Sequence, residues 1–460
     1  NENENDNPQP STLNPQPSTL NSQSLTYSQA GVYFDCLKNP DTTLYNVPMQ
    51  LTFSRNITAE ELLDAVKATV DNHQSFRLIF GTEEGEVRQF LDNDMPVEIP
   101  VSEMPEESID AYRHDFIRPF NLTQGPLFRF EILKTESQLH LFMDIHHLVT
   151  DGGSIDMIAK EISARLNGEE VDSEDYSYLQ FAADQKAAEG GEEYMAAKSF
   201  FDARLANCEG ASEIVPDKPK DDTASHTIGY CMCPTDMATV EHLARKLGVT
   251  PMSVFLAATY YTVSRFAGCR QVYLGTISNG RSNLHIYNTT GMFVNTLALS
   301  SEINDKTVSG FIQDTDRNFS DTINHEQYPF AQIAADYGFK PEIIFEYQVG
   351  VLTDNIVRGE KALLKGLSLD LAKFKMKFVI NSTPDGGHVI KIGYDEAFYT
   401  SELADSLAKS MSAVVEHFVS NPDAPVRSVS IMSSEQEAEV ALLHHTCLDP
   451  SAVRFPLFHN

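Results

Sequence analysis

Two adjacent histidines, followed by an acidic residue and two glycines, form the part of this chain best suited to chemistry. His146 and His147 leave a run of apolar residues, and Asp151, Gly152 and Gly153 follow directly. Imidazole exchanges protons near neutral pH, and glycine allows a backbone to approach a ligand closely. The segment therefore predicts a catalytic or binding loop at the end of a buried strand.

Adjacent histidines more often have a packing role than a catalytic one. The residues around them must therefore distinguish the two roles. The chain holds a second copy of the pattern at His444–Asp449, but Pro450 follows it, no β-rich run precedes it and no helical pattern comes after it. We interpret that second copy as chance. The first copy differs because its flanking residues predict regular structure on both sides.

Those flanking residues predict a strand, a tight loop and a helix. Residues 138–142 are β-rich and largely apolar, and residues 155–162 carry apolar side chains at helical spacing. Ser154 is the expected N-cap of the helix. Asp156 falls in the first turn, where the helix dipole favours a negative charge.

The segment from His146 to Gly152 resembles the HHxxxDG signature of the condensation domains of nonribosomal peptide synthetases, which chloramphenicol acetyltransferase and dihydrolipoyl acyltransferases share. Other segments between about residue 25 and residue 445 resemble further motifs of this family, and they occur in the same order as in the family. They lie at residues 25–34, 72–80, 117–127, 178–182, 291–297 and 325–330. The His motif followed by Phe-Val-Asn-Thr and Gln-Tyr-Pro-Phe is a highly specific combination.

The chain departs from the family pattern in three places. The second motif, usually written RHExLRTxF, keeps His73, Arg77 and Phe80 but changes three other positions. The Arg-rich core of the seventh motif is missing before the strand-like run at 343–348. Lys375 stands where the family normally carries Asp.

The resemblance implies an α/β fold of two chloramphenicol-acetyltransferase-like lobes, each a mixed sheet flanked by helices, in a V shape with an active-site tunnel between them. The expected lobes are residues 25–180 and 181–445. Residues 1–24 are rich in Asn, Pro, Ser and Gln and predict a disordered inter-domain linker. Residues 446–460 resemble the start of a linker towards an adenylation domain.

The composition limits the class of partner. The 460 residues carry a formal net charge of −32, which argues against nucleic acid and anionic membranes. We found no apolar run of about 18 residues and no signal-peptide pattern. The six cysteines show no zinc-site spacing, so we expect no metal and interpret them as reduced thiols of a cytoplasmic protein.

The resemblance implies peptide-bond formation. The amine of an acceptor aminoacyl thioester attacks the carbonyl of a donor acyl or peptidyl thioester. Both are delivered on the 4'-phosphopantetheine arms of peptidyl carrier domains, so no intrinsic cofactor is expected. An adenylation domain in the same polypeptide is the further expected partner, and the excised domain is expected to be monomeric. An epimerization domain or a coenzyme A-dependent acyltransferase of the same superfamily is the alternative.

The resemblance assigns the catalytic role to His147, either as a general base or as a group that places the amine and stabilises the tetrahedral intermediate. His146 is expected to be structural. Asp151 is expected to organise the loop through a buried ion pair with Arg77, which needs an acceptor in its apolar surroundings. Gly152 is expected to let the backbone approach the thioester.

Two further residues are expected to line the substrate tunnel, Ser154 behind the His motif and Asn295 in the second lobe. The alternative role for Asn295 is that of an ordinary turn residue. The first motif ends in Tyr33 and Phe34, and with residues 44–48 it looks more like the subtype that accepts an L-configured donor.

Overall fold

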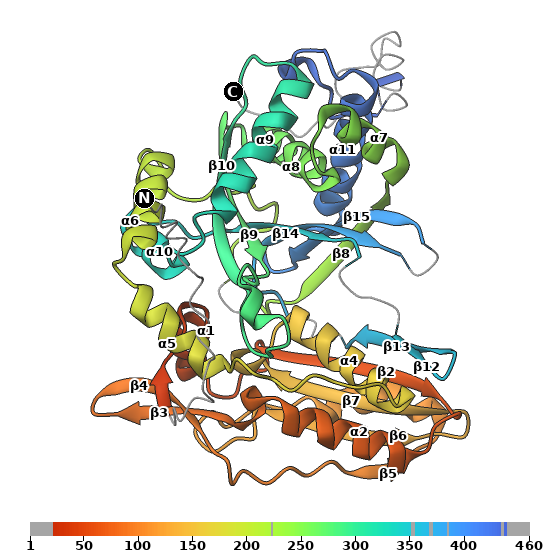
Figure 1. The fold of residues 1–460 in the computed structure, drawn as a ribbon. Helices are drawn as coiled ribbons and strands as arrows, with labels where there is room; N and C mark the ends of the chain where they lie inside the picture. The colour runs from red at the N-terminus through yellow and green to blue at the C-terminus, as the bar shows by residue number, and fades with distance from the viewer. Residues whose placement is uncertain are drawn as a thin grey trace, which may run out of the picture. The chain divides into compact units, whose positions relative to one another are not determined.

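The computed structural model describes residues 22–221, 224–350, 355–367, 371–383, 386–433 and 437–438. These residues divide into two compact units (Figure 1). The first unit holds the described residues up to Gly190 together with those of Asn279–Val294 and Leu352–Leu369, and the second unit holds the rest. This division differs from the expected one, because two later segments return to the first unit and because the boundary follows helix α5 (Tyr178–Ala188) rather than falling at residue 180.

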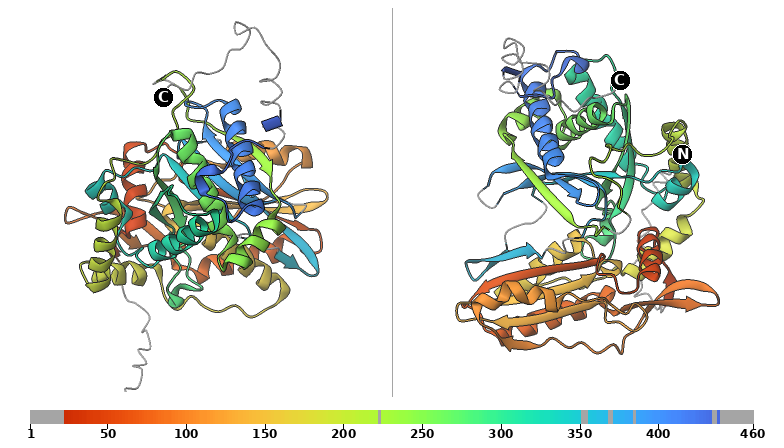
Figure 2. Two further views of the ribbon diagram at one scale, coloured as in Figure 1. Left: turned by 90° about the horizontal axis from the view of Figure 1, so that it is seen from above. Right: turned by 180° about the vertical axis from the view of Figure 1, so that it is seen from behind.

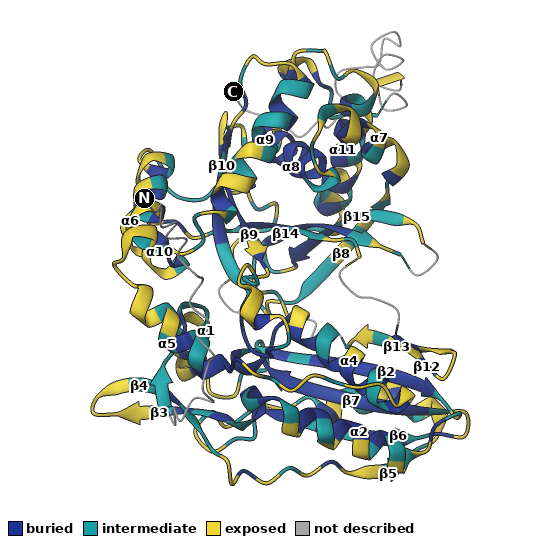
Figure 3. Cartoon of the chain, in the orientation of Figure 1, coloured by how far each residue is buried: buried dark blue, intermediate teal, exposed yellow. Residues whose placement is uncertain are grey.

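A six-stranded sheet forms the centre of the first unit. Its order is β12-β13-β2-β7-β6-β5, and β2 and β7 are the longest and most buried strands (Figure 3). The strands are β2 (Asn46–Ser54), β5 (Val101–Glu103), β6 (Phe128–Lys134), β7 (Gln138–His146), β12 (Asn355–Val357) and β13 (Glu360–Gly366). In the antiparallel β2–β7 pair, Asn46 stands opposite His146. The expected strand before the His pair is therefore confirmed.

Alternation along β7 places different chemistry on the two faces of this sheet. Leu141, Met143 and Ile145 join the main core, which helices α2 and α4 complete. Phe142 packs on the other face against helix α3, and Asp144 and His146 share that face by alternation. The helices of this unit are α1 (Tyr27–Lys38), α2 (Ala59–Asn72), α3 (Ile109–Phe116), α4 (Gly152–Asn167) and α5 (Tyr178–Ala188).

A small second sheet in the first unit has the order β1-β4-β3. Its strands are β1 (Ser22–Ser24), β3 (Leu78–Glu83) and β4 (Glu86–Leu91), and the 3-10 turn η1 (Gln74–Arg77) leads into β3. The prediction of a disordered linker over 1–24 is wrong for its last three residues, because they pair with β4. Residues 1–21 and the predicted linker 446–460 lie outside the described residues.

The second unit is built on a mixed six-stranded sheet of order β10-β9-β11-β14-β15-β8. Strand β11 runs parallel to both of its neighbours, and the other pairs are antiparallel. The strands are β8 (Ile228–Pro234), β9 (Gln271–Ser278), β10 (Asn295–Glu302), β11 (Ile343–Gln348), β14 (Met376–Ser382) and β15 (His388–Asp395). Both units are thus mixed α/β, which confirms the expected fold class.

Helices α8 and α11 supply the centre of the second unit's core and lie beside each other in both views of Figure 2. Helix α8 begins with Thr250 as its N-cap and Pro251 in its first turn. The helices are α6 (Glu192–Leu205), α7 (Met237–Leu247), α8 (Pro251–Ala267), α9 (Val308–Ile323), α10 (Phe330–Tyr337) and α11 (Ser401–Ser420). Among the described residues, no helix combines the length and apolarity needed to cross a membrane.

A buried charged cluster fixes the end of α2 in the first unit. His73 is 1% exposed, and its two ring nitrogens lie 2.8 Å from Glu161 Oε2 and 3.3 Å from Glu174 Oε1. Burial by itself would lower the pKa of His73, but the hydrogen bonds and charges of the two carboxylates outweigh it and raise the pKa to about 9. His73 is therefore held as a cation between helix α4 and the segment around Glu174.

This cluster predicts a loss of stability at alkaline pH. The folded pKa of His73 lies above its unfolded value of about 6.5. The stabilisation is therefore complete below that value and is lost as the pH rises through about 9. Thermal midpoints of wild type and His73→Gln should converge between pH 6.5 and 10. A difference in thermal midpoint between the two proteins that stays constant over that range would contradict the prediction.

Candidate active site

The His pair lies where strand β7 changes into a 3-10 turn. His146 is the last residue of β7, and His147 opens η3 (His147–Val149). The His147 N–H donates to the carbonyl oxygen of Tyr45 at 2.7 Å, which continues the β2–β7 ladder into the turn. Helix α4 (Gly152–Asn167) begins after two further residues, Thr150 and Asp151. The predicted strand, tight loop and helix are confirmed.

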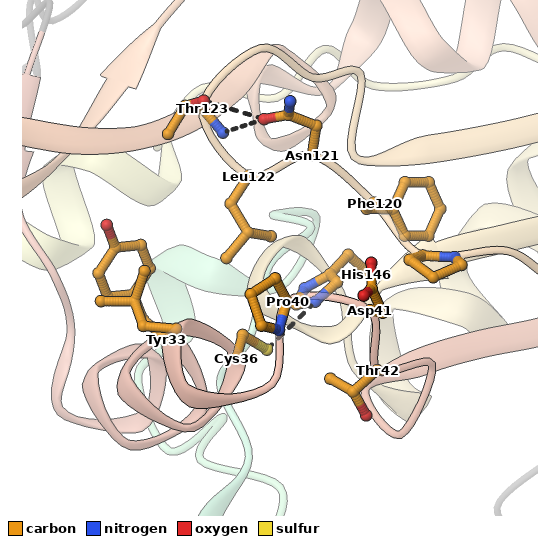
Figure 4. Close-up of a pocket in the computed structure, with 12 residues that line it drawn as sticks. Tyr33, Cys36, Pro40, Asp41, Thr42, Phe120, Asn121, Leu122, Thr123 and His146 are labelled. Carbon is orange, nitrogen blue, oxygen red and sulfur yellow. Dashed lines mark hydrogen bonds between the residues drawn. The ribbon is translucent and has the colours of Figure 1, made fainter.

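The side chain of His146 is buried and secures the turn from inside. The backbone N–H of Leu148 donates to its Nδ1 at 3.1 Å, and its Nε2 lies 3.7 Å from Cys36 Sγ (Figure 4). An Nδ1 that accepts a hydrogen bond places the proton of a neutral ring on Nε2. The edge of Phe120 completes the surroundings at a centroid distance of 5.9 Å. This arrangement fits the structural role expected for His146.

His147 differs from its neighbours in exposure. Its side chain is partly exposed, whereas His146, Leu148 and Val149 are buried. The backbone on both sides is held, because the His147 carbonyl also accepts from the Thr150 N–H at 3.4 Å. The Nδ1 atom of His147 is buried, so the partial exposure of the residue lies elsewhere. A partly exposed histidine on a fixed backbone suits a catalytic role.

Asp151 is the N-cap of helix α4, and the expected N-cap Ser154 is wrong. The Asp151 Oδ1 accepts from the Ser154 N–H at 2.7 Å, and Oδ2 accepts from the Phe293 N–H at 2.9 Å. The side chain is 1% exposed. One buried carboxylate thus binds backbone donors that are 139 residues apart in sequence (154 and 293), an arrangement that fits the expected role of Asp151 as an organiser of the loop.

The cation that accompanies Asp151 is Arg281, which our sequence analysis did not single out. Its Nη2 lies 3.4 Å from Asp151 Oδ1, and its Nη1 donates to the carbonyls of Ile286 and Thr289. Its guanidinium stacks on the ring of Phe293 with a centroid distance of 4.4 Å. The sequence signal was modest: an arginine shortly before the fifth family motif at residues 291–297.

The predicted Arg77–Asp151 ion pair is wrong. Arg77 Nη2 pairs with Asp71 at 2.9 Å, and its Nη1 donates to the Met95 carbonyl at 2.5 Å. The apolar residues around Arg77 suggested a buried strand, but Arg77 ends the η1 turn and its side chain is 19% exposed. A local acceptor at the end of α2 therefore satisfies it without any contact with the His loop.

Ser154 is fully buried, so its predicted place in the wall of a substrate tunnel does not fit the structure. Its hydroxyl donates to the Gly291 carbonyl at 2.9 Å and accepts from the Gly291 N–H and from Arg281 Nη2. One donor and two acceptor positions exhaust the hydrogen-bonding capacity of a hydroxyl. Ser154 therefore joins helix α4 to the Asn279–Val294 segment.

The two glycines of the motif have different surroundings. A Cβ on Gly152 would meet no atom within 4 Å, whereas a Cβ on Gly153 would lie 3.0 Å from Arg281 Nε. The close approach inside the protein is therefore at Gly153. Gly152 is exposed at the start of α4, and the expected approach of its backbone to a thioester stays a prediction.

Three family-like motifs of the first unit meet at Tyr178. Its hydroxyl donates to the Met292 carbonyl at 2.7 Å and lies 3.0 Å from Thr26 Oγ1. Gly291 has φ +156°, and a Cβ there would lie 2.0 Å from the Tyr178 ring, so the residue must be glycine. The first, fourth and fifth motifs thus share one buried contact beside Asp151.

Asn295 belongs to the second unit, where it is the first residue of β10. Its Nδ2 donates to the Glu326 carbonyl at 3.1 Å, and its partner across the strands is Ser278. It is partly exposed and lies in a strand rather than in a turn. Its role in a substrate tunnel stays a prediction.

Lys375, in the same unit, pairs with Glu213 at 2.6 Å and Glu342 at 3.5 Å.

A buried carboxyl near the His pair was also missed. Asp144 lies on β7 two residues before His146 and is fully buried. Its Oδ2 accepts from Asn46 Nδ2 and Arg129 Nη1, both at 2.8 Å. Burial raises the pKa of Asp144 to about 6, against the opposing effects of these two partners. The available signal was Asn46, a polar residue at the start of the apolar strand β2. Elsewhere in the described residues, no group of three or more His, Cys, Asp or Glu side chains could hold a metal.

Comparisons with known proteins place the chain in a family. The condensation-domain family model matches residues 20–441. Bacitracin synthase 1 of Bacillus licheniformis is 23% identical over 413 residues, and surfactin synthase subunit 1 of Bacillus subtilis (strain 168) is 26% identical over 409. Each match covers 86% of this chain but 8% and 11% of the relative, so the chain spans about a tenth of these synthetases.

The fold agrees with this family. The condensation domain from the Monacolin K polyketide synthase MokA superposes with a TM-score of 0.77 at 16% identity, covering 88% of this chain and 99% of that domain. The chain belongs to the condensation-domain family, whose members in nonribosomal peptide synthetases are acyltransferase-type enzymes that form peptide bonds.

The observed pairing predicts different effects for the two arginines. Arg281→Ala leaves the buried Asp151 without its cation and should lower the free energy of unfolding by roughly 3–5 kcal/mol. Arg77→Ala removes a surface pair and should cost about 1.5 kcal/mol or less. Urea denaturation with double-mutant cycles measures both effects. Coupling of Asp151 to Arg77 but not to Arg281 would overturn the assignment.

Proposed function

We propose that this chain joins a donor acyl or peptidyl thioester to the amine of an acceptor aminoacyl thioester, and that His147 is the catalytic residue. The observation that carries the proposal is the His147 turn itself. Its backbone is tied to Tyr45 and Thr150, its neighbouring side chains are buried, and His147 itself is partly exposed although its Nδ1 is buried. Membership of the condensation-domain family supports the reaction class.

In the proposed reaction the acceptor amine attacks the donor carbonyl carbon. A new N–C bond forms, the C–S bond of the thioester breaks, and the proton lost by the amine ends on the departing thiolate. The thioester supplies the driving force. An α-amine has an unperturbed pKa of about 8, so a useful fraction is already neutral near pH 7. His147 therefore acts mainly by placing the amine and stabilising the tetrahedral intermediate, with proton transfer as its second available role.

The residues behind His147 hold it rather than react. The buried His146 ring accepts the Leu148 N–H, and Asp151 anchors the start of α4. Both oxygens of Asp151 accept backbone N–H groups, so the side chain is engaged in holding the backbone. Arg281 and Ser154 complete this support.

The substrates imply the partners. Donor and acceptor would arrive on the phosphopantetheine arms of two peptidyl carrier domains, and an adenylation domain in the same polypeptide would load the acceptor. Asn295 is proposed to contribute a polar group to the substrate tunnel. The cytoplasmic location and monomeric state expected from the sequence stay predictions.

The His147→Ala variant should lose amide formation while keeping its fold. Its rate should fall at least about tenfold, which corresponds to about 1.4 kcal/mol in the barrier. The assay mixes a loaded donor carrier and a loaded acceptor carrier with the chain and follows product on the acceptor by mass. His242→Ala, at an exposed position of α7, is the matched control. Retention of more than about a tenth of the wild-type rate would remove His147 from the centre of the mechanism.

We further propose that the donor is L-configured, because Tyr33, Phe34 and residues 44–48 look like the L-accepting subtype. Matched L- and D-donor thioesters on one carrier should then give faster product formation with the L-donor. The acceptor and carrier stay constant, so the donor centre is the single variable. Preference for the D-donor would contradict this assignment.

A further inference from the structure

A pocket of about 340 Å³ opens in the second unit where helix α8 ends. The buried residues Tyr261 and Ile303 contribute to its wall. Arg265, Arg270 and Arg427 also line it, and we call it the arginine pocket. None of these residues belongs to the His147 turn or to the contacts that hold that turn.

The lining of the arginine pocket has the opposite charge to the chain as a whole. The chain holds 66 Asp and Glu residues against 34 Lys and Arg residues. An average part of its surface would therefore carry more carboxylates than cations. Among the described residues, the lining includes three arginines and no Asp or Glu. A concave site lined by one sign of charge attracts ligands of the other sign, which here are anions.

Arg265 is the cation of this pocket that is not already neutralised. It lies in the last turn of α8 and is exposed, and within the described part of the chain it makes no ion pair. The negative end of the helix dipole lies close to it. That end corresponds to only about half an elementary charge, so most of the charge of Arg265 is left for a ligand.

The other two arginines have weak partners. Arg270 Nη2 lies 3.3 Å from Glu302 Oε1, and Arg427 Nη1 lies 2.7 Å from Asp305 Oδ1. All four side chains are at least 41% exposed. Ion pairs between such exposed groups contribute little, because water screens them. A ligand with a higher charge than a carboxylate can therefore compete for both guanidinium groups.

The backbone that carries the three arginines is held in place. The Ile303 N–H donates to the carbonyl oxygen of Arg270 at 2.9 Å, which fixes the turn after α8 to the end of β10. The Tyr261 hydroxyl donates to the carbonyl oxygen of Val429 at 2.6 Å. That bond ties α8 to the segment of Arg427, two residues earlier. The site therefore does not need to assemble when a ligand arrives.

We propose that the arginine pocket binds a small ligand that carries a phosphate group. A guanidinium presents its N–H donors in a fork that matches phosphate oxygens. A phosphate ester offers three terminal oxygens to three arginines, whereas a single carboxylate offers two. The net charge of −32 disfavours a long polyanion, and a volume of about 340 Å³ suits a small molecule. This binding does not depend on the proposed amide formation.

Titration calorimetry of the full chain with inorganic pyrophosphate tests the site, and citrate serves as the carboxylate probe. Pyrophosphate should bind at one saturable site and more tightly than citrate. Arg265→Gln and Arg427→Gln should each raise the dissociation constant about tenfold or more. Arg245→Gln removes the same charge from an exposed position on α7 outside the pocket and should change it less than about twofold.

A second pair of variants should act in the opposite direction. Glu302→Gln releases Arg270 and should tighten pyrophosphate binding, whereas Glu241→Gln removes the partner of Arg245 and should not. Without ligand, Arg265→Gln should keep the thermal midpoint of the wild type, since it breaks no ion pair among the described residues. Absence of saturable pyrophosphate binding, equal weakening in Arg245→Gln, or tighter binding of citrate would each overturn the proposal.

Discussion

The buried carboxylate of Asp151 is the constraint on which the site depends. It accepts the N–H of Ser154 at the start of α4 and the N–H of Phe293 in the Asn279–Val294 segment, and Arg281 balances its charge. A buried carboxylate without these partners would carry a desolvation cost of several kcal/mol. The same contacts therefore stabilise the helix, bring the later segment into the first unit and set where the chain leaves the His147 turn.

The His turn is held on two independent sides. On one side Asp151, Ser154 and Arg281 fix the helix that follows it, and on the other the β2–β7 ladder extends to His147 through the Tyr45 carbonyl. His146 adds a third restraint from within through Leu148. Catalysis by positioning requires such rigidity, because a displacement of about 1 Å at a reacting group can cost 100-fold in rate. Restraint of the turn on these sides suits the positioning role that we propose for His147.

The sequence was sufficient for the local structure and for the family, but not for long-range partners. Strand β7 and helix α4 follow from periodicity, and the expected role of Asp151 as organiser follows from the motif. The partner of Asp151 did not follow, since Arg281 is 130 residues away and Arg77 looked buried from its neighbours. Ser154 was misplaced for a related reason. Asp and Ser are both good N-caps, and the choice depends on Phe293 and Gly291, which periodicity within α4 cannot place.

The central claim is that Asp151 acts by holding the His147 turn and α4 against the Asn279–Val294 segment. Amide hydrogen exchange at Ser154 and Phe293 tests it most directly, because these two N–H groups are the donors to the carboxylate. Both amides should exchange slowly in the wild type and in His147→Ala, and both should lose protection together in Asp151→Ala. Fast exchange at either amide in the wild type, or unchanged protection in Asp151→Ala, would contradict the account.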